Sequence, residues 1–132
     1  MNRNESYLLM KKHAIWFVPA IMVAIGIFAL STFLALPIQV EGVSNLDKWE
    51  HTFAYFVLSF SFLFAYAKSG RLSKKVTLLV VLLSSVYGLT LEFAQFQFFT
   101  YRYFEWADAG ANVLGAVLGF LIFLTVKGKI GV

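Results

Sequence analysis

A carboxylate and an amide interrupt a long apolar stretch of the chain, within residues 87–97 (YGLTLEFAQFQ). Glu92 and Gln95 are three positions apart, so a helix would place them on the same face. Ionisable side chains are costly in the hydrocarbon of a membrane, where they usually pair with a partner or line a functional site. A carboxylate in such a place can act as a general base, ligate a metal ion or pair with a cation. The spacing therefore identifies Glu92 as the candidate functional centre.

Composition assigns the chain to the membrane proteins. Of its 132 residues, 60% are hydrophobic and only 14% are charged, whereas soluble domains are nearer to about 45–50% apolar and about 25% charged. The chain has no cysteine, which excludes disulfides, thiol catalysis and cysteine-based zinc sites. Its net charge of +4 does not predict a nucleic-acid partner, because the basic residues gather at the ends of the apolar segments.

Four apolar segments are long enough to cross a bilayer as helices, which takes about 20 residues each. They are residues 14–36, 49–67, 76–99 and 107–126. No repeat or second domain is evident, so we predict a single transmembrane domain over residues 1–132. The expected fold is an all-α integral membrane protein, with four transmembrane helices in a compact antiparallel bundle.

The distribution of Lys and Arg predicts the orientation of these helices. Of the 11 basic residues, only Lys48 and Arg102 fall on one side of the predicted membrane. Because basic loops stay in the cytoplasm, we predict that both termini and loop 68–75 are cytoplasmic, in a multi-pass protein of the cell membrane. Pro37 is predicted to end the first helix, whereas Pro19 is expected to kink it or to lie in its first turns.

With this topology, polar side chains from three predicted helices converge at the outer end of the bundle. Glu92 would lie about 10 Å below the outer end of its helix, since each residue rises about 1.5 Å. We expect it to face Arg102, His51 or Asn112 rather than lipid. The residues predicted to bind a ligand there are Asp47, Lys48, Gln95, Arg102, Asp108 and Asn112. A purely structural network of ion pairs and hydrogen bonds stays open as an alternative.

Glycines mark the faces on which the last two predicted helices would pack. Gly115 and Gly119 form a G-x-x-x-G pattern, which lets another helix backbone approach closely. We expect this face to pack against the third helix, because the two helices are joined by a short loop. Gly88 lies one turn below Glu92 and is expected to allow a second close approach.

Three motifs follow one another along the chain: DKWEHTFAYFVL, YGLTLEFAQ and RYFEWADAGANVLGAVLG. Over about residues 47–120, the chain resembles the VanZ-like membrane protein family. The matching positions are Asp47, Lys48, His51, Tyr55, Tyr87, Glu92, Gln95, Arg102, Asp108, Asn112, Gly115 and Gly119. The chain departs from the family in the bulky YFEWA after Arg102, where members often carry smaller or hydroxylated residues.

The resemblance implies a four-span integral membrane protein. The family is named for a member that raises resistance to the glycopeptide antibiotic teicoplanin, so a contribution to such antibiotic resistance is one implied role. The resemblance does not supply a biochemical mechanism.

The first functional interpretation is a protein that binds or modifies a cell-envelope lipid or a lipid-linked wall precursor at the outer polar cluster. Arg102 and Lys48 would hold a phosphate or carboxylate, and Gln95 and Asn112 would add hydrogen bonds. The expected partners are membrane lipids or such a precursor, with no cofactor and no metal ion. Assembly into a homo-oligomer is left open.

Two other interpretations stay open. An intramembrane hydrolase or transferase would use Glu92 as a general base together with His51, or would hold a divalent metal ion between His51, Glu92 and Asp108. Whether the protein is an enzyme stays undecided, because the sequence contains no known catalytic signature. A small proton-coupled transporter would also need a carboxylate, but its site belongs nearer to the midplane of the membrane.

Overall fold

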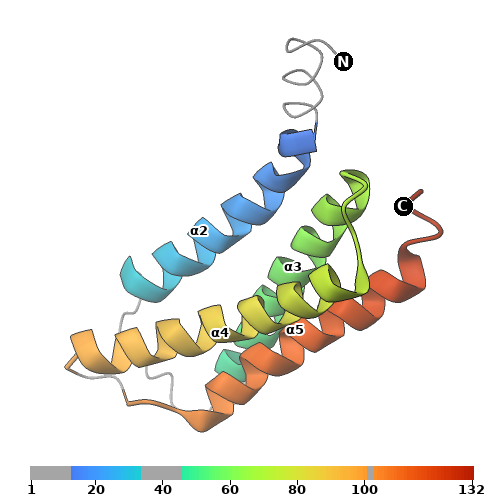
Figure 1. Cartoon of the computed structure of the whole chain (residues 1–132). Helices are drawn as coiled ribbons and strands as arrows, with labels where there is room; N and C mark the ends of the chain where they lie inside the picture. Colours follow the sequence, from blue (N-terminus) through green and yellow to red (C-terminus); the bar gives the residue numbers. More distant parts are fainter. Residues whose placement is uncertain (1–12, 34–45, 101–102) are drawn as a thin grey trace.

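The apolar segments of the sequence form helices separated by short connections (Figure 1). The structure is a computed structural model that describes residues 13–33, 46–100 and 103–132. The elements are η1 (Ile15–Phe17), α2 (Val18–Phe33), α3 (Leu46–Lys68), α4 (Lys74–Phe98) and α5 (Trp106–Val126). Over the described ranges the chain forms no strand, so the prediction of an all-α fold is confirmed for them.

The first helix begins with a tight turn, because η1 leads directly into α2. Pro19 occupies the second position of α2, where the missing N–H costs nothing since the first N–H groups of a helix have no intrahelical partner. This is one of the two placements expected for Pro19. Pro37 lies outside the described residues.

The innermost helix is α3, which contacts η1, α2, α4 and α5. Along most of its length it packs against α5, where the glycines of α5 allow the two backbones to touch. A Cβ atom at Gly119 would lie 2.6 Å from the carbonyl oxygen of Phe56, and a Cβ atom at Gly115 would overlap the carbonyl oxygen of Thr52.

The expectation that Gly115 and Gly119 pack against the third predicted helix, α4, is therefore wrong. A short connection does make α4 and α5 neighbours, but it does not fix which face of α5 points toward α4. The glycine face points toward α3, and α4 instead receives the Asn112 side chain, which lies next to Gly88. Gly88 thus leaves room for a side chain rather than for a backbone.

Two groups of apolar side chains fill the bundle. Ile27, Tyr55, Leu58 and Leu91 pack where α2 meets α3 and α4. Leu63, Val80 and Phe123 pack toward the other end, where α3, α4 and α5 meet. The Phe123 ring lies 6.0 Å from the Phe60 ring in an edge-to-face arrangement, which is a favourable geometry for aromatic pairs.

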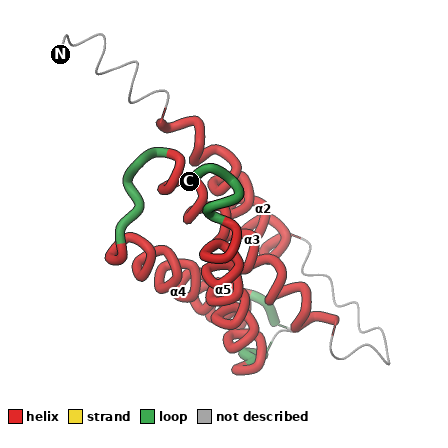
Figure 2. The backbone as a smooth tube through the Cα atoms, turned by 90° about the vertical axis from the view of Figure 1, so that its right-hand side faces the viewer, coloured by secondary structure: helices red, strands yellow, loops and turns green. Residues whose placement is uncertain are grey.

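The beginning and the end of the described chain lie at the same end of the bundle, beside the connection 69–73 (Figures 1 and 2). Trp16 of η1 packs on Phe64 near the end of α3, with ring centroids 6.0 Å apart. Lys68, the last residue of α3, donates a hydrogen bond to the carbonyl oxygen of Ile130 at 3.1 Å. The opposite end of the bundle, where α3 and α5 begin and α4 ends, carries most of the buried polar side chains.

Three helical segments of the described chain are long and apolar enough to cross a membrane: Ile15–Phe33, Lys74–Phe98 and Trp106–Val126. Their exposed surfaces are rich in Leu, Ile, Val and Phe, as expected of helices that face lipid. α3 is long enough, with 23 residues, but charged residues in its first turns lower its hydropathy.

Candidate functional site

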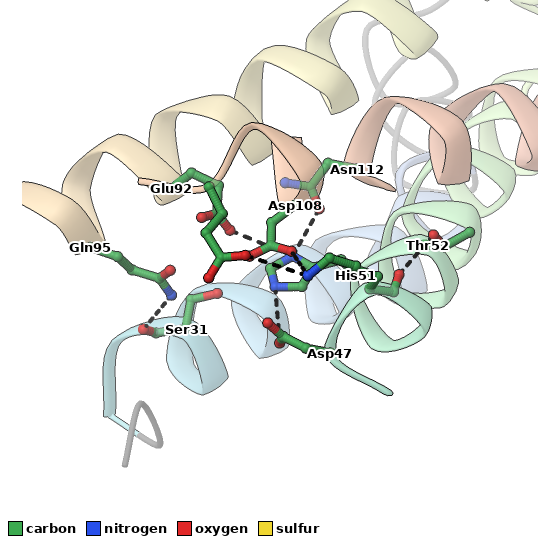
Figure 3. Close-up of polar contacts among 10 residues, drawn as sticks. Ser31, Asp47, His51, Thr52, Glu92, Gln95, Asp108 and Asn112 are labelled. Atoms are coloured by element: carbon green, nitrogen blue, oxygen red, sulfur yellow. Dashed lines mark hydrogen bonds and ion pairs between the residues drawn. The ribbon is translucent and has the colours of Figure 1, made fainter. Parts of the chain in front are cut away.

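Polar side chains from three helices meet where α3 and α5 begin and where α4 ends (Figure 3). Asp47, Lys48 and His51 come from α3, Glu92 and Gln95 from α4, and Asp108 and Asn112 from α5. We call these seven residues the polar cluster. Glu92, Asp108 and Asn112 are only 4%, 3% and 1% exposed, so the folding of the bundle buries two carboxylates close together.

His51 is the centre of the polar cluster and lies between two carboxylates (Figure 3). Its Nε2 atom is 3.5 Å from Oδ1 of Asp47, and its Nδ1 atom is 3.6 Å from Oε1 of Glu92. Nδ1 also lies 2.9 Å from Oδ1 of Asn112, which is within hydrogen-bond distance. Asn112 thus fixes the orientation of the imidazole ring from the neighbouring helix.

Lys48 lies between one buried and one exposed carboxylate. Its Nζ atom is 3.3 Å from Oδ1 of Asp108 and 3.4 Å from Oε2 of Glu105. Burial by itself would lower the pKa of Lys48, but the carboxylates of Asp108 and Glu105 raise that pKa above its ordinary value. Oδ1 of Asp108 accepts no hydrogen bond from the described residues, and its contact with Lys48 is an ion pair.

Two hydrogen bonds from α4 attach α2 to the bundle. Gln95 donates from Nε2 to the carbonyl oxygen of Ser31 at 2.9 Å, and Tyr87 donates from its hydroxyl to the carbonyl oxygen of Ala24 at 2.8 Å. Ser31 is close to the end of α2, where the last carbonyl groups of a helix have no intrahelical donor. Gln95 therefore satisfies a backbone group that would be costly to leave unpaired in lipid.

A pocket of about 510 Å³ lies between α2, α3 and α4 beside the polar cluster. One part of its wall is apolar and includes Ile27, Leu30 and Phe53. Another part is polar and consists of Asp47, Glu50, His51, Gln95, Ser31 and Tyr55. The pocket thus offers an apolar surface and hydrogen-bonding groups to the same ligand.

The structure brings together every sequence-predicted site residue that it describes. Arg102 lies outside the described residues, so its expected place next to Glu92 stays a prediction. Of the three partners expected for Glu92, His51 is one, with its Nδ1 atom 3.6 Å from Oε1 of Glu92. Sequence reasoning missed Glu105, the second partner of Lys48, which is the N-cap residue of α5, three residues before Asp108. It also missed Glu50, which lines the pocket.

Three members of the polar cluster could ligate one metal ion. Asp47, His51 and Asp108 each present a ligand atom, and these atoms lie within 4.8 Å of one another. The set expected from the sequence contained Glu92 in place of Asp47. Glu92 instead faces the other nitrogen of His51, where it can orient the ring or exchange a proton with it.

Comparison with known proteins identifies one curated relative. No model of a protein family matches the chain, and no solved structure matches it. The chain is 37% identical, over 89 residues, to an uncharacterized protein of Schizosaccharomyces pombe. The aligned region covers 67% of the chain and 49% of that protein, so the chain spans about half the length of this relative.

Proposed function

We propose that the chain is a VanZ-like, multi-pass protein of the cell membrane that binds the headgroup of an envelope lipid or a lipid-linked wall precursor. The observation that carries this proposal is the pocket beside the polar cluster. Asp47, His51 and Gln95 line it together with the apolar side chains of Ile27, Leu30 and Phe53. This combination suits an amphiphile, whose apolar chain and polar headgroup need adjoining surfaces of different character.

The proposed topology has four spans, with α3 as the innermost helix and both termini in the cytoplasm. Basic residues support it, because Lys68, Lys74 and Lys127 lie at the ends of α3, α4 and α5 farthest from the polar cluster. Positive charge of this kind stays on the cytoplasmic side. The polar cluster would then lie near the outer surface, at the depth of the lipid headgroups.

Single cysteines test the orientation, since the chain has none of its own. Tyr103→Cys, at a highly exposed position near the polar cluster, is expected to react with an impermeant thiol reagent added to intact cells. Ser73→Cys, before α4, is expected to react only after the membrane is opened. The reverse pattern would place the polar cluster in the cytoplasm and contradict the proposed location of the ligand.

Lipid binding by purified protein tests the proposed function itself. The probe is a short-chain phosphatidic acid, which carries a phosphate on a glycerolipid. Glu92→Gln keeps the shape of the side chain but removes the charge that lies 3.6 Å from Nδ1 of His51, a residue that lines the pocket. Because this contact orients the imidazole, we expect a folded protein with affinity reduced at least about tenfold, as for loss of a contact to a charged group. Glu105→Gln removes an exposed charge at the same end and is expected to bind normally. Equal binding by both variants would reject a role for Glu92 in the site.

The geometry of His51 also favours a second candidate, an intramembrane hydrolase or transferase acting on the bound lipid. A histidine that lines a pocket and has a carboxylate on each ring nitrogen is placed to accept and return a proton. Under this alternative, incubation with phosphatidic acid would release inorganic phosphate or a transferred product, which mass spectrometry detects. His51→Gln would abolish the release.

A further inference from the structure

The polar cluster and its neighbours carry more negative than positive charge in the part of the chain that the structure describes. The described region contains one ammonium group, that of Lys48, and the carboxylates of Asp47, Glu50, Glu92, Glu105 and Asp108. Lys48 is already paired with Asp108 and Glu105. Among the described residues, a lipid phosphate that approached the pocket would therefore meet more carboxylates than ammonium groups.

The carboxylates on both sides of the His51 imidazole would stabilise a positive charge at the ring. A neutral imidazole has one N–H group and one lone pair, but both ring nitrogens of His51 face carboxylates, at 3.5 Å and 3.6 Å. One carboxylate would thus face a lone pair unless the ring nitrogen beside it binds a proton or a metal ion. This holds for either orientation of the Asn112 amide, which can be rotated to exchange its oxygen and nitrogen.

We propose that Asp47, His51 and Asp108 bind a divalent metal ion, with zinc the best match to one imidazole and two carboxylates. Two ligands that hold one ion at about 2.0–2.2 Å in a tetrahedral site lie about 3.3–3.6 Å apart. Nε2 of His51 and Oδ1 of Asp47 are 3.5 Å apart, which is too long for a good hydrogen bond but fits this spacing. The ligand atoms of all three residues lie within 4.8 Å of one another.

Asp108 provides an independent observation. The residue is only 3% exposed, and its Oδ1 atom accepts no hydrogen bond from the described residues, although it forms an ion pair with Lys48 at 3.3 Å. A buried carboxylate oxygen without a donor is costly, and Asp108 presents a ligand atom to His51 and Asp47 across the helix interface (Figure 3). A metal ion at this position would bind a carboxylate oxygen whose described contact is the ion pair with Lys48.

The other nitrogen of His51 has the partners that a metal-bound histidine needs. Such a histidine usually donates its second N–H to a carbonyl or carboxylate oxygen, which fixes the ring and strengthens the ligand. Nδ1 lies 2.9 Å from Oδ1 of Asn112 and 3.6 Å from Oε1 of Glu92. Both partners are buried, so they hold the ring with Nε2 directed toward Asp47.

The metal ion would give the pocket a group that binds phosphate. Asp47 and His51 line the pocket, so the remaining coordination position would face the headgroup. There an oxygen of a lipid phosphate could replace water, as substrates do at zinc sites with three protein ligands. This part of the inference rests on the proposed lipid-binding function, whereas the metal site itself does not.

Metal content tests the site directly. Purified protein is stripped with a chelator, exchanged into chelator-free buffer and titrated with zinc, followed by elemental analysis. We expect one ion per chain, and a higher melting temperature with zinc than without. Asp47→Asn, His51→Gln and Asp108→Asn should each weaken zinc binding at least about tenfold, since each removes a ligand. Glu92→Gln should keep the stoichiometry but weaken binding by about 10- to 100-fold, the effect of losing an outer partner.

Glu50→Gln is the matched control, because Glu50 also lines the pocket but is not one of the three ligands. It should bind zinc like the unmodified protein. No zinc bound by folded protein, or equal binding by the three ligand variants and the control, would overturn the metal site. If a ligand variant does not fold, the melting temperature of the unmodified protein with and without zinc still decides the question.

The same samples separate the inference from the proposed function. Phosphatidic acid is expected to bind the zinc-loaded protein and to lose at least about tenfold in affinity after chelation. Equal lipid binding with and without zinc would contradict the proposal that the metal ion binds the lipid phosphate, but it would not contradict the proposed lipid-binding function. Zinc binding without any lipid binding would instead reject the proposed function and support the metal site alone.

Discussion

The two ends of the bundle are built from the same three helices but differ in chemistry. At one end, α3, α4 and α5 bring together His51, Glu92 and Asn112. At the other end, the same helices pack Leu63, Val80 and Phe123, all nearly inaccessible. Its main polar feature is Lys68, which donates hydrogen bonds to the carbonyl oxygens of Ile130 and Gly131.

This difference suggests that one end stabilises the bundle and that the other end carries the proposed binding site. Lipid is as apolar as the side chains of a helix, so helices in a membrane associate through close packing rather than through the hydrophobic effect. The end around Phe123 provides such packing and presents no buried carboxylate among its described residues. The polar cluster buries charges that cost free energy, which supports the proposal that it binds a ligand.

The largest expected effect is at the apolar end. Phe123→Ala should lower the free energy of unfolding by about 3–5 kcal/mol, because it opens a cavity where the ring is only 1% exposed. Phe98→Ala, at a position 79% exposed, is the matched control and should have little effect. Thermal unfolding in detergent measures both. If the folded fraction of Phe123→Ala no longer bound phosphatidic acid, the two ends could not be treated as separate.

The next largest effect is expected at the close contact between the backbones of α3 and α5. Gly115→Ala should destabilise the bundle by about 1–3 kcal/mol, as overpacking does, because its Cβ atom would overlap the Thr52 carbonyl oxygen. Gly110→Ala lies in the same helix with nothing within 4 Å of its Cβ atom. It should unfold at the same temperature as the unmodified protein or slightly higher. Equal melting temperatures for the two variants would contradict the close approach of α3 and α5.

The smallest effect is expected at the attachment of α2. Tyr87→Phe removes the hydrogen bond to the Ala24 carbonyl oxygen and should cost about 1 kcal/mol. Hydrogen exchange followed by mass spectrometry should show faster exchange in α2 but not in α5. Unchanged exchange in α2 would mean that the hydrogen bond does not hold this helix, and uniform faster exchange would mean that α2 is part of the common core.

The positions of the helices could be predicted from the hydropathy of the sequence. The polar cluster could be predicted because successive helices run in opposite directions, which brings the polar ends of three of them together. α4 and α5 begin and end within two residues of the predicted limits, since long apolar segments identify helices well. The direction in which α5 faces could not be predicted, because Gly115 permits a close approach without specifying the partner. The pairing of Lys48 with Glu105 was also not predictable, because the two residues are 57 positions apart and meet only through the packing of α3 on α5.

The hydrogen bonds that attach α2 have a consequence for how its sequence can change. Both acceptors are main-chain oxygens, those of Ala24 and Ser31, and every amino acid carries such an oxygen. Apart from Ala20 and Ile27, the side chains of α2 are not buried. Evolution can therefore exchange most residues of α2 for other apolar ones without loss of attachment, whereas Tyr87 and Gln95 in α4 cannot change so freely. We expect related chains to diverge most in their first helix.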